Sequence, residues 1–266
     1  MLRLATYFVA VTLVAATVGY YVRERQRPAP LPEPADVVDG NWLEHLHSQN
    51  PKVAEEAARQ LQDLGAEAIP QIKEALEGPT TDMARRKAAL KAAGMLGTAA
   101  SPAMNEVAAL LPDPELTAEA AVALSFMGRE AYAPLRLATS SEDPLVRKEA
   151  LRSLGKLRER APLDPRAVVP LLLHGLADSD AGVRTVSATY LGILHDDGPA
   201  VVPALIETLN DEDAEVRAAA ATALGSFEAQ AAQAVPALKK AAGDRDENVA
   251  REAGLAIVKL QSSSRK

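Results

Sequence analysis

Two stretches of the chain, 33 residues apart, are nearly the same. Residues 178–192 read DSDAGVRTVSATYLG and residues 211–225 read DEDAEVRAAAATALG, with nine of the fifteen positions identical. A period of about 20 to 50 residues is typical of a stack of one structural unit, in which each copy covers the apolar face of its neighbour. The chain is therefore predicted to consist largely of copies of one short unit.

Further copies are located by the apolar residue and the glycine that end the quoted stretch. Such pairs occur at Leu64-Gly65, Leu96-Gly97, Met127-Gly128, Leu154-Gly155, Leu191-Gly192 and Leu224-Gly225. The intervals between successive glycines are 32, 31, 27, 37 and 33 residues, and Ile257-Val258 is the equivalent of a seventh pair. A second apolar stretch follows each of the six pairs, and five of these stretches carry a proline near their start. Each unit is thus predicted to contain two short segments.

Both segments have the periodicity of a helix. Val216, Ala220 and Leu224 are four residues apart, which places them on one stripe of a helix. Gly225 is expected to supply the left-handed residue that ends this helix. Pro203 is expected in the first turn of the following helix, where a missing N–H costs nothing. Because neither helix could bury its apolar face alone, the pairs are predicted to stack.

The charged residues of the unit are expected to have a structural role. Four aspartates stand three residues before a valine that is predicted to be buried, where a carboxylate can cap a helix N-terminus: Asp143, Asp180, Asp213 and Asp246. An arginine follows three of these aspartates four residues later: Arg147, Arg184 and Arg217. Each arginine can pair within its helix or bridge to the aspartate of the adjacent unit and form a ladder. A row of anion-binding sites is the functional alternative.

The pattern D-x-x-V-R-x-x-A-x-x-x-L-G followed by A-V-P-A-L resembles HEAT repeats, specifically the short type of the phycobilisome bilin lyases, over about residues 42–260. The resemblance implies an all-α fold, a right-handed α-solenoid of about six to seven two-helix repeats. It implies that first helices line the convex face and second helices the concave face. Fold alone does not settle function, and such arrays serve mostly as scaffolds. A non-enzymatic scaffold or adaptor is therefore predicted, with an enzyme or enzyme subunit of the bilin-lyase kind, acting on a small molecule, as the alternative.

The N-terminal part of the chain differs from the repeats. Residues 4–22 are an uncharged run of 19 residues, long enough as a helix to cross a membrane. We predict a transmembrane anchor or signal segment over residues 1–23, a proline-rich linker over residues 24–40 and the repeat solenoid over residues 41–266. The protein is expected to be a single-pass membrane protein, and the side of the membrane that holds the repeats stays open.

Composition argues against several kinds of chemistry. The chain has no cysteine, and its four histidines have no metal-ligand spacing, so no catalytic residue, cofactor or metal is expected. Residues 1–27 contain four arginines and one glutamate, a net charge of +3. Since the whole chain has a net charge of −7, the remaining residues carry a net charge of −10. A surface this acidic would repel phosphates unless it hid a local basic stripe, so nucleic acid is not an expected partner.

A protein partner is predicted instead. On the second helices, the positions three and four residues after the proline recur at the repeat period and should align as a row. If the apolar member of each pair is buried, the following residues would face the concave groove and contact the partner: Glu74, His174, Glu207 and Lys240. An extended peptide or a helix would suit such a groove.

Overall fold

The computed structural model describes residues 41–78, 82–161 and 163–263, and all regular structure within these ranges is helical. The described part of the chain divides into two units between residues 57 and 58. The predicted anchor and linker, residues 1–23 and 24–40, lie outside the described residues. Within the described ranges, no helix combines the length and the apolar character that a membrane crossing requires.

The helices follow one another with short connections. In chain order the α-helices are α2 (Trp42–His45), α3 (Pro51–Leu64), α4 (Ile69–Glu77), α5 (Met83–Leu96), α6 (Met104–Ala109), α7 (Thr117–Phe126), α8 (Tyr132–Ala138), α9 (Pro144–Arg160), α10 (Pro165–Gly175), α11 (Ala181–Leu194), α12 (Gly198–Thr208), α13 (Ala214–Leu224), α14 (Ala231–Ala241) and α15 (Glu247–Ser263). Short 3-10 turns are η2 (Gly65–Ala68), η3 (Gly97–Ala103), η4 (Arg129–Ala131) and η5 (Glu228–Gln230).

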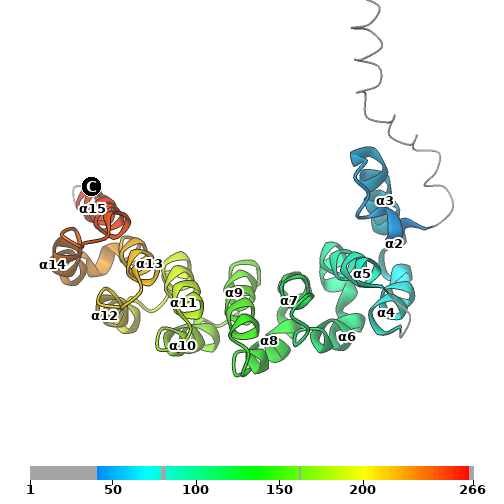
Figure 1. The fold of residues 1–266 in the computed structure, drawn as a ribbon, viewed down its shortest axis with the longest axis horizontal. Coiled ribbons are helices and arrows are strands. Elements are labelled where there is room, and N and C mark those ends of the chain that lie inside the picture. Colours follow the sequence, from blue (N-terminus) through cyan, green and yellow to red (C-terminus); the bar gives the residue numbers. More distant parts are fainter. Residues whose placement is uncertain (1–40, 79–81, 162, 264–266) are drawn as a thin grey trace, which may run out of the picture. The chain divides into compact units, whose positions relative to one another are not determined.

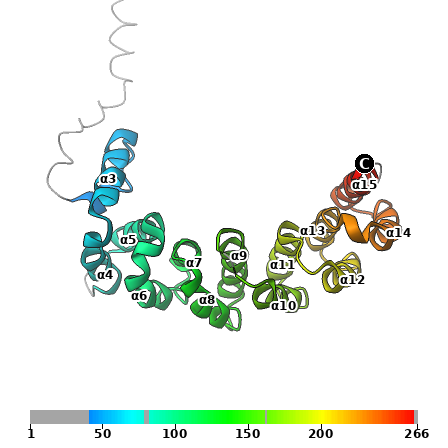
Figure 2. The same cartoon turned by 180° about the vertical axis from the view of Figure 1, so that it is seen from behind.

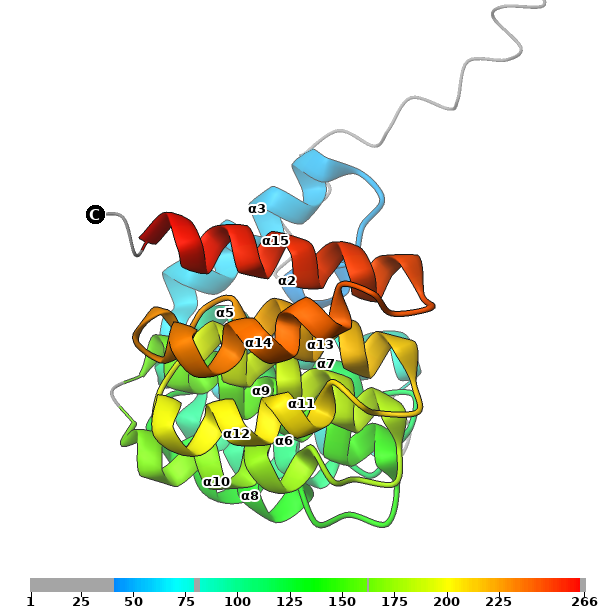
Figure 3. The same cartoon turned by 90° about the vertical axis from the view of Figure 1, so that its left-hand side faces the viewer.

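The second unit has two layers of helices (Figure 1). The inner layer comprises α5, α7, α9, α11, α13 and α15, each packed against the next, and the outer layer comprises α4, α6, α8, α10, α12 and α14. Figure 2 shows the same two layers from behind, and Figure 3 shows that the helices run across the row. The predicted stripe on α13 is fully buried at Val216, Ala220 and Leu224.

The layer order is the reverse of the expected one. The first helices of the pairs lie on the concave side of this unit and the second helices, with their prolines, on the convex side (Figure 1). Helices of the inner layer pack on one another along much of their length, whereas direct contact between successive outer helices is sparse. Alanine and glycine at the inner contacts let those helices approach closely, so the row bends toward them.

Two kinds of glycine account for the close packing. Three glycines have positive φ and follow a helix: Gly65 at 52°, Gly97 at 57° and Gly128 at 94°. The expectation of a left-handed cap at Gly225 is wrong, because its φ is −62°. Gly192, inside α11, serves a different purpose, since a Cβ there would lie 2.5 Å from the Cα of Ala223 on α13. Glycine is needed at such positions for close approach of two helices.

These contacts define the true register of the repeats. Gly94 contacts Ala123, and Gly225 contacts Ala256, in the way that Gly192 contacts Ala223. Ala223 stands two residues before Gly225, the glycine of the next helix. By the same offset from Ala123, Ser125 is the residue of α7 that corresponds to these glycines. The glycines at the ends of α5 and α7, used above as markers, therefore stand three residues after the true counterparts.

Pro203 also differs from its expected place. It is the sixth residue of α12, inside the helix rather than in its first turn, and Pro170 and Pro236 are likewise inside α10 and α14. Each helix starts about one turn before the apolar stretch that marks it in the sequence. A proline at such a place removes one hydrogen bond of the helix.

Candidate functional site

The repeated aspartates lie at the N-termini of inner helices. Asp143 Oδ1 accepts a hydrogen bond from the Leu145 amide at 2.8 Å, and Asp180 Oδ1 accepts one from the Val183 amide at 3.0 Å. Asp213 Oδ1 accepts from the Glu215 and Val216 amides at 2.8 and 3.2 Å. Each carboxylate thus satisfies amides that the first turn of a helix leaves without a partner.

The repeated arginines pair with a different set of aspartates. Arg147 donates from Nε and Nη2 to Asp178 at 2.8 and 2.6 Å, and Arg184 donates in the same way to Asp211 at 2.8 and 2.9 Å. Arg217 donates to Asp244 at 2.9 Å from both nitrogens. Each partner belongs to the next repeat and stands two residues before the capping aspartate. Each arginine therefore bridges to an aspartate of the next repeat, but this aspartate is not the one that caps a helix.

The remaining donors of each arginine are also occupied. Arg184 Nη1 donates to the backbone carbonyls of Asp178 and Ser179 at 2.9 and 3.1 Å, and the arginine is 8% exposed. The hydrogen bond from Arg147 holds the pKa of the Asp178 carboxyl below its usual range, although burial opposes this effect. A guanidinium held in this way has little capacity for an external anion, which favours a structural role over a row of anion sites.

The four residues predicted to contact a partner lie on the outer layer. They are exposed, but the expectation that they face the concave groove is wrong because the layers are reversed: Glu74 is on α4, His174 on α10, Glu207 on α12 and Lys240 on α14. Neither of the two cavities described below is lined by any of them. Their part in partner binding stays a prediction.

The inner layer presents its own stripe of side chains. Each inner helix is covered by its neighbours in the layer and by the outer layer, which leaves one stripe free. In the register set by the glycine contacts, one row across these helices is Lys91, Val122, Arg152, Thr189, Thr222 and Leu255. The next row, one turn later, is Met95, Phe126, Lys156, Ile193, Ser226 and Lys259. We call these two rows the inner face.

The inner face is basic, whereas the chain as a whole is acidic. Its twelve positions hold four basic residues and no acidic residue, and all twelve are at least partly exposed. Three acidic residues stand one turn earlier, and each is close to a basic neighbour. Glu119 lies 3.1 Å from Lys87, Glu149 3.2 Å from Arg152 and Glu252 3.0 Å from Arg251. The negative charge of these carboxylates is thus partly compensated by the basic side chains beside them.

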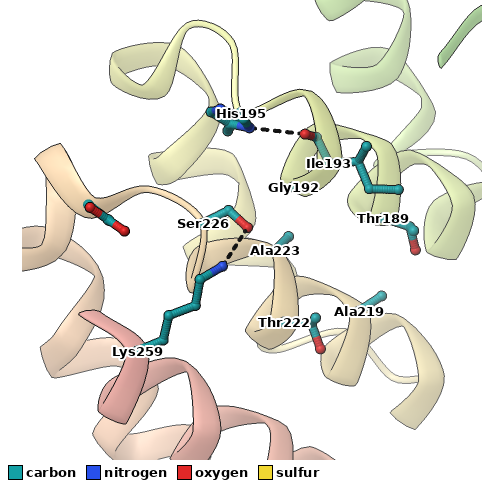
Figure 4. A pocket seen from close by; sticks show the side chains of 10 residues that line it. Thr189, Gly192, Ile193, His195, Ala219, Thr222, Ala223, Ser226 and Lys259 are labelled. Atoms are coloured by element: carbon teal, nitrogen blue, oxygen red, sulfur yellow. Dashed lines mark hydrogen bonds between the residues drawn. The ribbon is translucent and has the colours of Figure 1, made fainter. Parts of the chain in front are cut away.

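A cavity of about 540 Å³ lies between α11, α13 and α15 (Figure 4). Thr189, Ile193 and His195 line it from α11 and its end, and Lys259 reaches into it from α15 to donate to Ser226 Oγ at 3.4 Å. The Nδ1 atom of His195 is 3.0 Å from the Ile193 carbonyl oxygen. Small side chains, hydroxyl groups, the His195 imidazole, the Glu228 carboxylate and the Lys259 amine therefore surround this cavity.

A second cavity, of about 760 Å³, lies at the C-terminal ends of α7 and α9. Phe126, Leu157 and Arg160 line it, and the guanidinium carbon of Arg160 is 3.9 Å from the centroid of the Phe126 ring. Arg160 Nη1 also donates to Ser125 Oγ at 3.1 Å. An apolar wall and the Arg160 guanidinium meet at this place, and Arg129 and Glu130 line the cavity as well.

Comparison with known proteins identifies the repeat. The family model of HEAT repeats matches residues 41–125, 104–192, 137–213 and 202–265, which together cover most of the chain. The chain belongs to the HEAT-repeat family. No curated protein matches its sequence.

Several solved structures resemble this HEAT-repeat protein. The crystal structure of Escherichia coli YibA is 16% identical and covers 88% of this chain and 99% of that chain, with a TM-score of 0.51. An engineered protein is 24% identical over 83% of this chain and 67% of its own, with a TM-score of 0.47. The complex of CpcE and CpcF of phycocyanin lyase from Nostoc sp. PCC7120 is 22% identical over 58% of this chain and 98% of that chain, with a TM-score of 0.49. At these identities the likeness concerns the fold alone.

The basic residues of the HEAT-repeat inner face were missed by reasoning from the sequence. They lie between residues 91 and 259 with no local motif, and only the register of the glycine contacts aligns them. The sequence pattern that could have revealed them is a lysine or arginine at equivalent positions of different inner helices. Among the described residues, no three histidine or acidic side chains are grouped as metal ligands would be.

Proposed function

We propose that this HEAT-repeat protein is a membrane-tethered scaffold that binds a protein partner through its inner face. The observation that carries the proposal is the exposed row of basic and apolar side chains on the concave side of the second unit. A HEAT-repeat array offers a long surface on which an extended chain or a helix can lie. In this proposal the protein takes no part in chemistry, and residues 4–22 hold it in the membrane.

In-cell crosslinking tests the partner. The full-length tagged protein is crosslinked, extracted from membranes and captured, and bound proteins are identified by mass spectrometry beside a form that lacks residues 41–266. We expect one recurrent protein that is lost with the repeats. Repeated recovery of no repeat-dependent protein, or a chromophore bound in stoichiometric amount, would contradict the proposal and favour a small-molecule enzyme.

Membrane fractionation tests the tether separately. The full chain is compared with a form that starts at residue 24. The membrane pellet from cells that produce either form is washed with alkaline carbonate. We expect the full chain to stay in the pellet and the shortened chain to be released. Release of both forms would refute the anchor and leave the binding proposal untouched.

A further inference from the structure

We propose that the inner face across α5, α7 and α9 binds a short acidic segment of a protein partner that carries an apolar or aromatic side chain. This inference rests on the scaffold function proposed above and names the chemistry of its partner. The surface, here called the basic-apolar site, has three basic members on the inner face, Lys91, Arg152 and Lys156, and a fourth, Arg160, one turn further along α9. Its apolar members are Met95, Val122 and Phe126.

Charge is unevenly distributed over the repeats, although Glu119 and Glu149 lie on inner helices beside basic neighbours. Acidic residues gather in the loops before the inner helices, where those of the C-terminal repeats cap helices or pair with the ladder arginines. Lysines and arginines gather on the free stripe of α5 and α9 instead. Lys156 and Arg160 form no ion pair with any carboxylate in the part of the chain that the structure describes, so they are free to meet an external anion. A local positive surface on an acidic protein selects acidic segments.

Exposed apolar side chains occupy the middle of this surface. Met95 on α5 is 38% exposed, and Val122 and Phe126 on α7 are 36% and 42% exposed. Val122 and Phe126 are one turn apart, and Met95 stands in the same row as Phe126. Large apolar side chains grouped on a surface and rimmed by charges are typical of an interaction site. An apolar side chain of the partner would cover them.

The cavity beside Phe126 gives that side chain a place. Phe126 and Leu157 provide apolar walls beside Arg129, Glu130 and Arg160, and the cavity volume of about 760 Å³ exceeds the size of one aromatic ring. The guanidinium of Arg160, fixed by the Phe126 ring and by Ser125, keeps further N–H groups for a carboxylate. Because it is already ordered, it loses less conformational freedom on binding than a free arginine would.

The spacing of the helices sets the length of the segment. Packed helices lie about 8–10 Å apart, so α5 and α9 are separated by about 16–20 Å. An extended chain rises about 3.3 Å per residue, so roughly five or six residues span this distance. The segment would place acidic residues toward α5 and α9 and its apolar residue over α7.

A nucleic acid fits the site less well. It would extend beyond three helices and meet the acidic loops on the edge of the stack, where phosphates are repelled. Phe126 is the one aromatic side chain that the basic-apolar site offers for base stacking, and its face is occupied by Arg160. A single-stranded oligonucleotide therefore serves as a competitor in the test.

The test is fluorescence anisotropy with the full chain in detergent micelles. The probe is a fluorescein-labelled synthetic peptide that places a phenylalanine between two pairs of acidic residues. In one control peptide alanine replaces the phenylalanine, and in the other amide side chains replace the acidic ones. We expect saturable binding of the first peptide that weakens by about 10-fold with either change and falls as salt is added.

Matched protein variants locate the site. Lys156→Glu on the inner face and Lys239→Glu on the outer helix α14 change the net charge equally, and the two lysines are half-exposed and exposed, respectively. We expect Lys156→Glu and Phe126→Ala each to weaken peptide binding by about 10-fold and Lys239→Glu by less than about 2-fold. Circular dichroism of each variant checks that the helices remain.

The outcomes that overturn the inference are distinct. Equal losses with Lys156→Glu and Lys239→Glu would mean that binding follows net charge or involves the outer layer. Tighter binding of the oligonucleotide than of the peptide would make the ligand a nucleic acid. If the crosslinked partner of the full chain persists with Lys156→Glu and Phe126→Ala, the basic-apolar site is refuted while the scaffold function stands.

Discussion

Arg184 of one repeat and Asp211 of the next are joined by two parallel hydrogen bonds, Nε to Oδ2 at 2.8 Å and Nη2 to Oδ1 at 2.9 Å. The side chains are 9% and 12% exposed, so the pair is largely shielded from water. The same arginine also holds the carbonyls of the loop before its own helix. One side chain therefore fixes a loop and the junction between two repeats.

Replacing Arg184 by alanine should destabilise the C-terminal repeats strongly. Loss of one member of a buried pair leaves the other charge without compensation, which costs about 3–5 kcal/mol. Urea unfolding followed by circular dichroism measures the change. Arg166→Ala is the control, because Arg166 and Asp164 form a pair on the surface, with side chains 89% and 51% exposed, and no change in the unfolding midpoint is expected. Similar midpoints for both variants would contradict a structural role of the ladder.

Acid should weaken the ladder in a defined range. The pKa values of Asp178 and Asp244 are lowered, first by hydrogen bonds from Arg147 and Arg217. Since the folded pKa lies below the unfolded value of about 3.9, these carboxylates stabilise the fold above about pH 4, and this contribution is lost as the pH falls through the lowered pKa. Thermal unfolding should therefore change little between about pH 7 and 5 and shift to lower temperature near pH 3.

The variant Asp244→Asn isolates one member of that set. An amide cannot titrate, so the variant should be less stable than the parent at neutral pH and should lose less stability between about pH 5 and pH 3. Parallel curves for the two proteins over this range would show that Asp244 does not contribute to the acid response.

Two glycines should respond to alanine in opposite ways. In Gly192→Ala the new Cβ would lie 2.5 Å from the backbone of Ala223, so α11 and α13 must separate, at a cost of about 1–3 kcal/mol. Gly254 in α15 has no atom within 4 Å of an added Cβ, so Gly254→Ala should stabilise the helix by about 0.5–1 kcal/mol. Urea midpoints of the full chain measure both. Equal effects would disprove the register assigned to the inner layer.

The two-helix repeat could be predicted from the sequence because its signals are local. An aspartate three residues before a buried valine, a glycine after a leucine and a second apolar stretch recur within about one period, and each belongs to one helix or its end. The error at Gly97 and Gly128 arose because a glycine that ends a helix and a glycine that admits a neighbouring helix look alike in one sequence. Only the contact with Ala123 or Ala223 separates the two kinds.

The reversed layers and the basic-apolar site could not be predicted in the same way. Curvature depends on the difference between two interhelical distances, and residues from several repeats determine it. Lys91, Val122 and Lys156 become neighbours in one surface only when three helices are packed in the right register. The net charge of the repeat domain gives no sign of this basic surface, because the negative charges of the acidic loops outnumber its positive charges.

The ladder is distributed unevenly over the second unit. Its bidentate pairs join α9 to α15 through three successive junctions, and among the described residues no such pair joins α5 to α7 or α7 to α9. At the equivalent place in α7, Thr117 donates only to carbonyls of its own preceding loop. We therefore expect the segment from α9 onward to bend less than the junctions around α7, which carry Phe126.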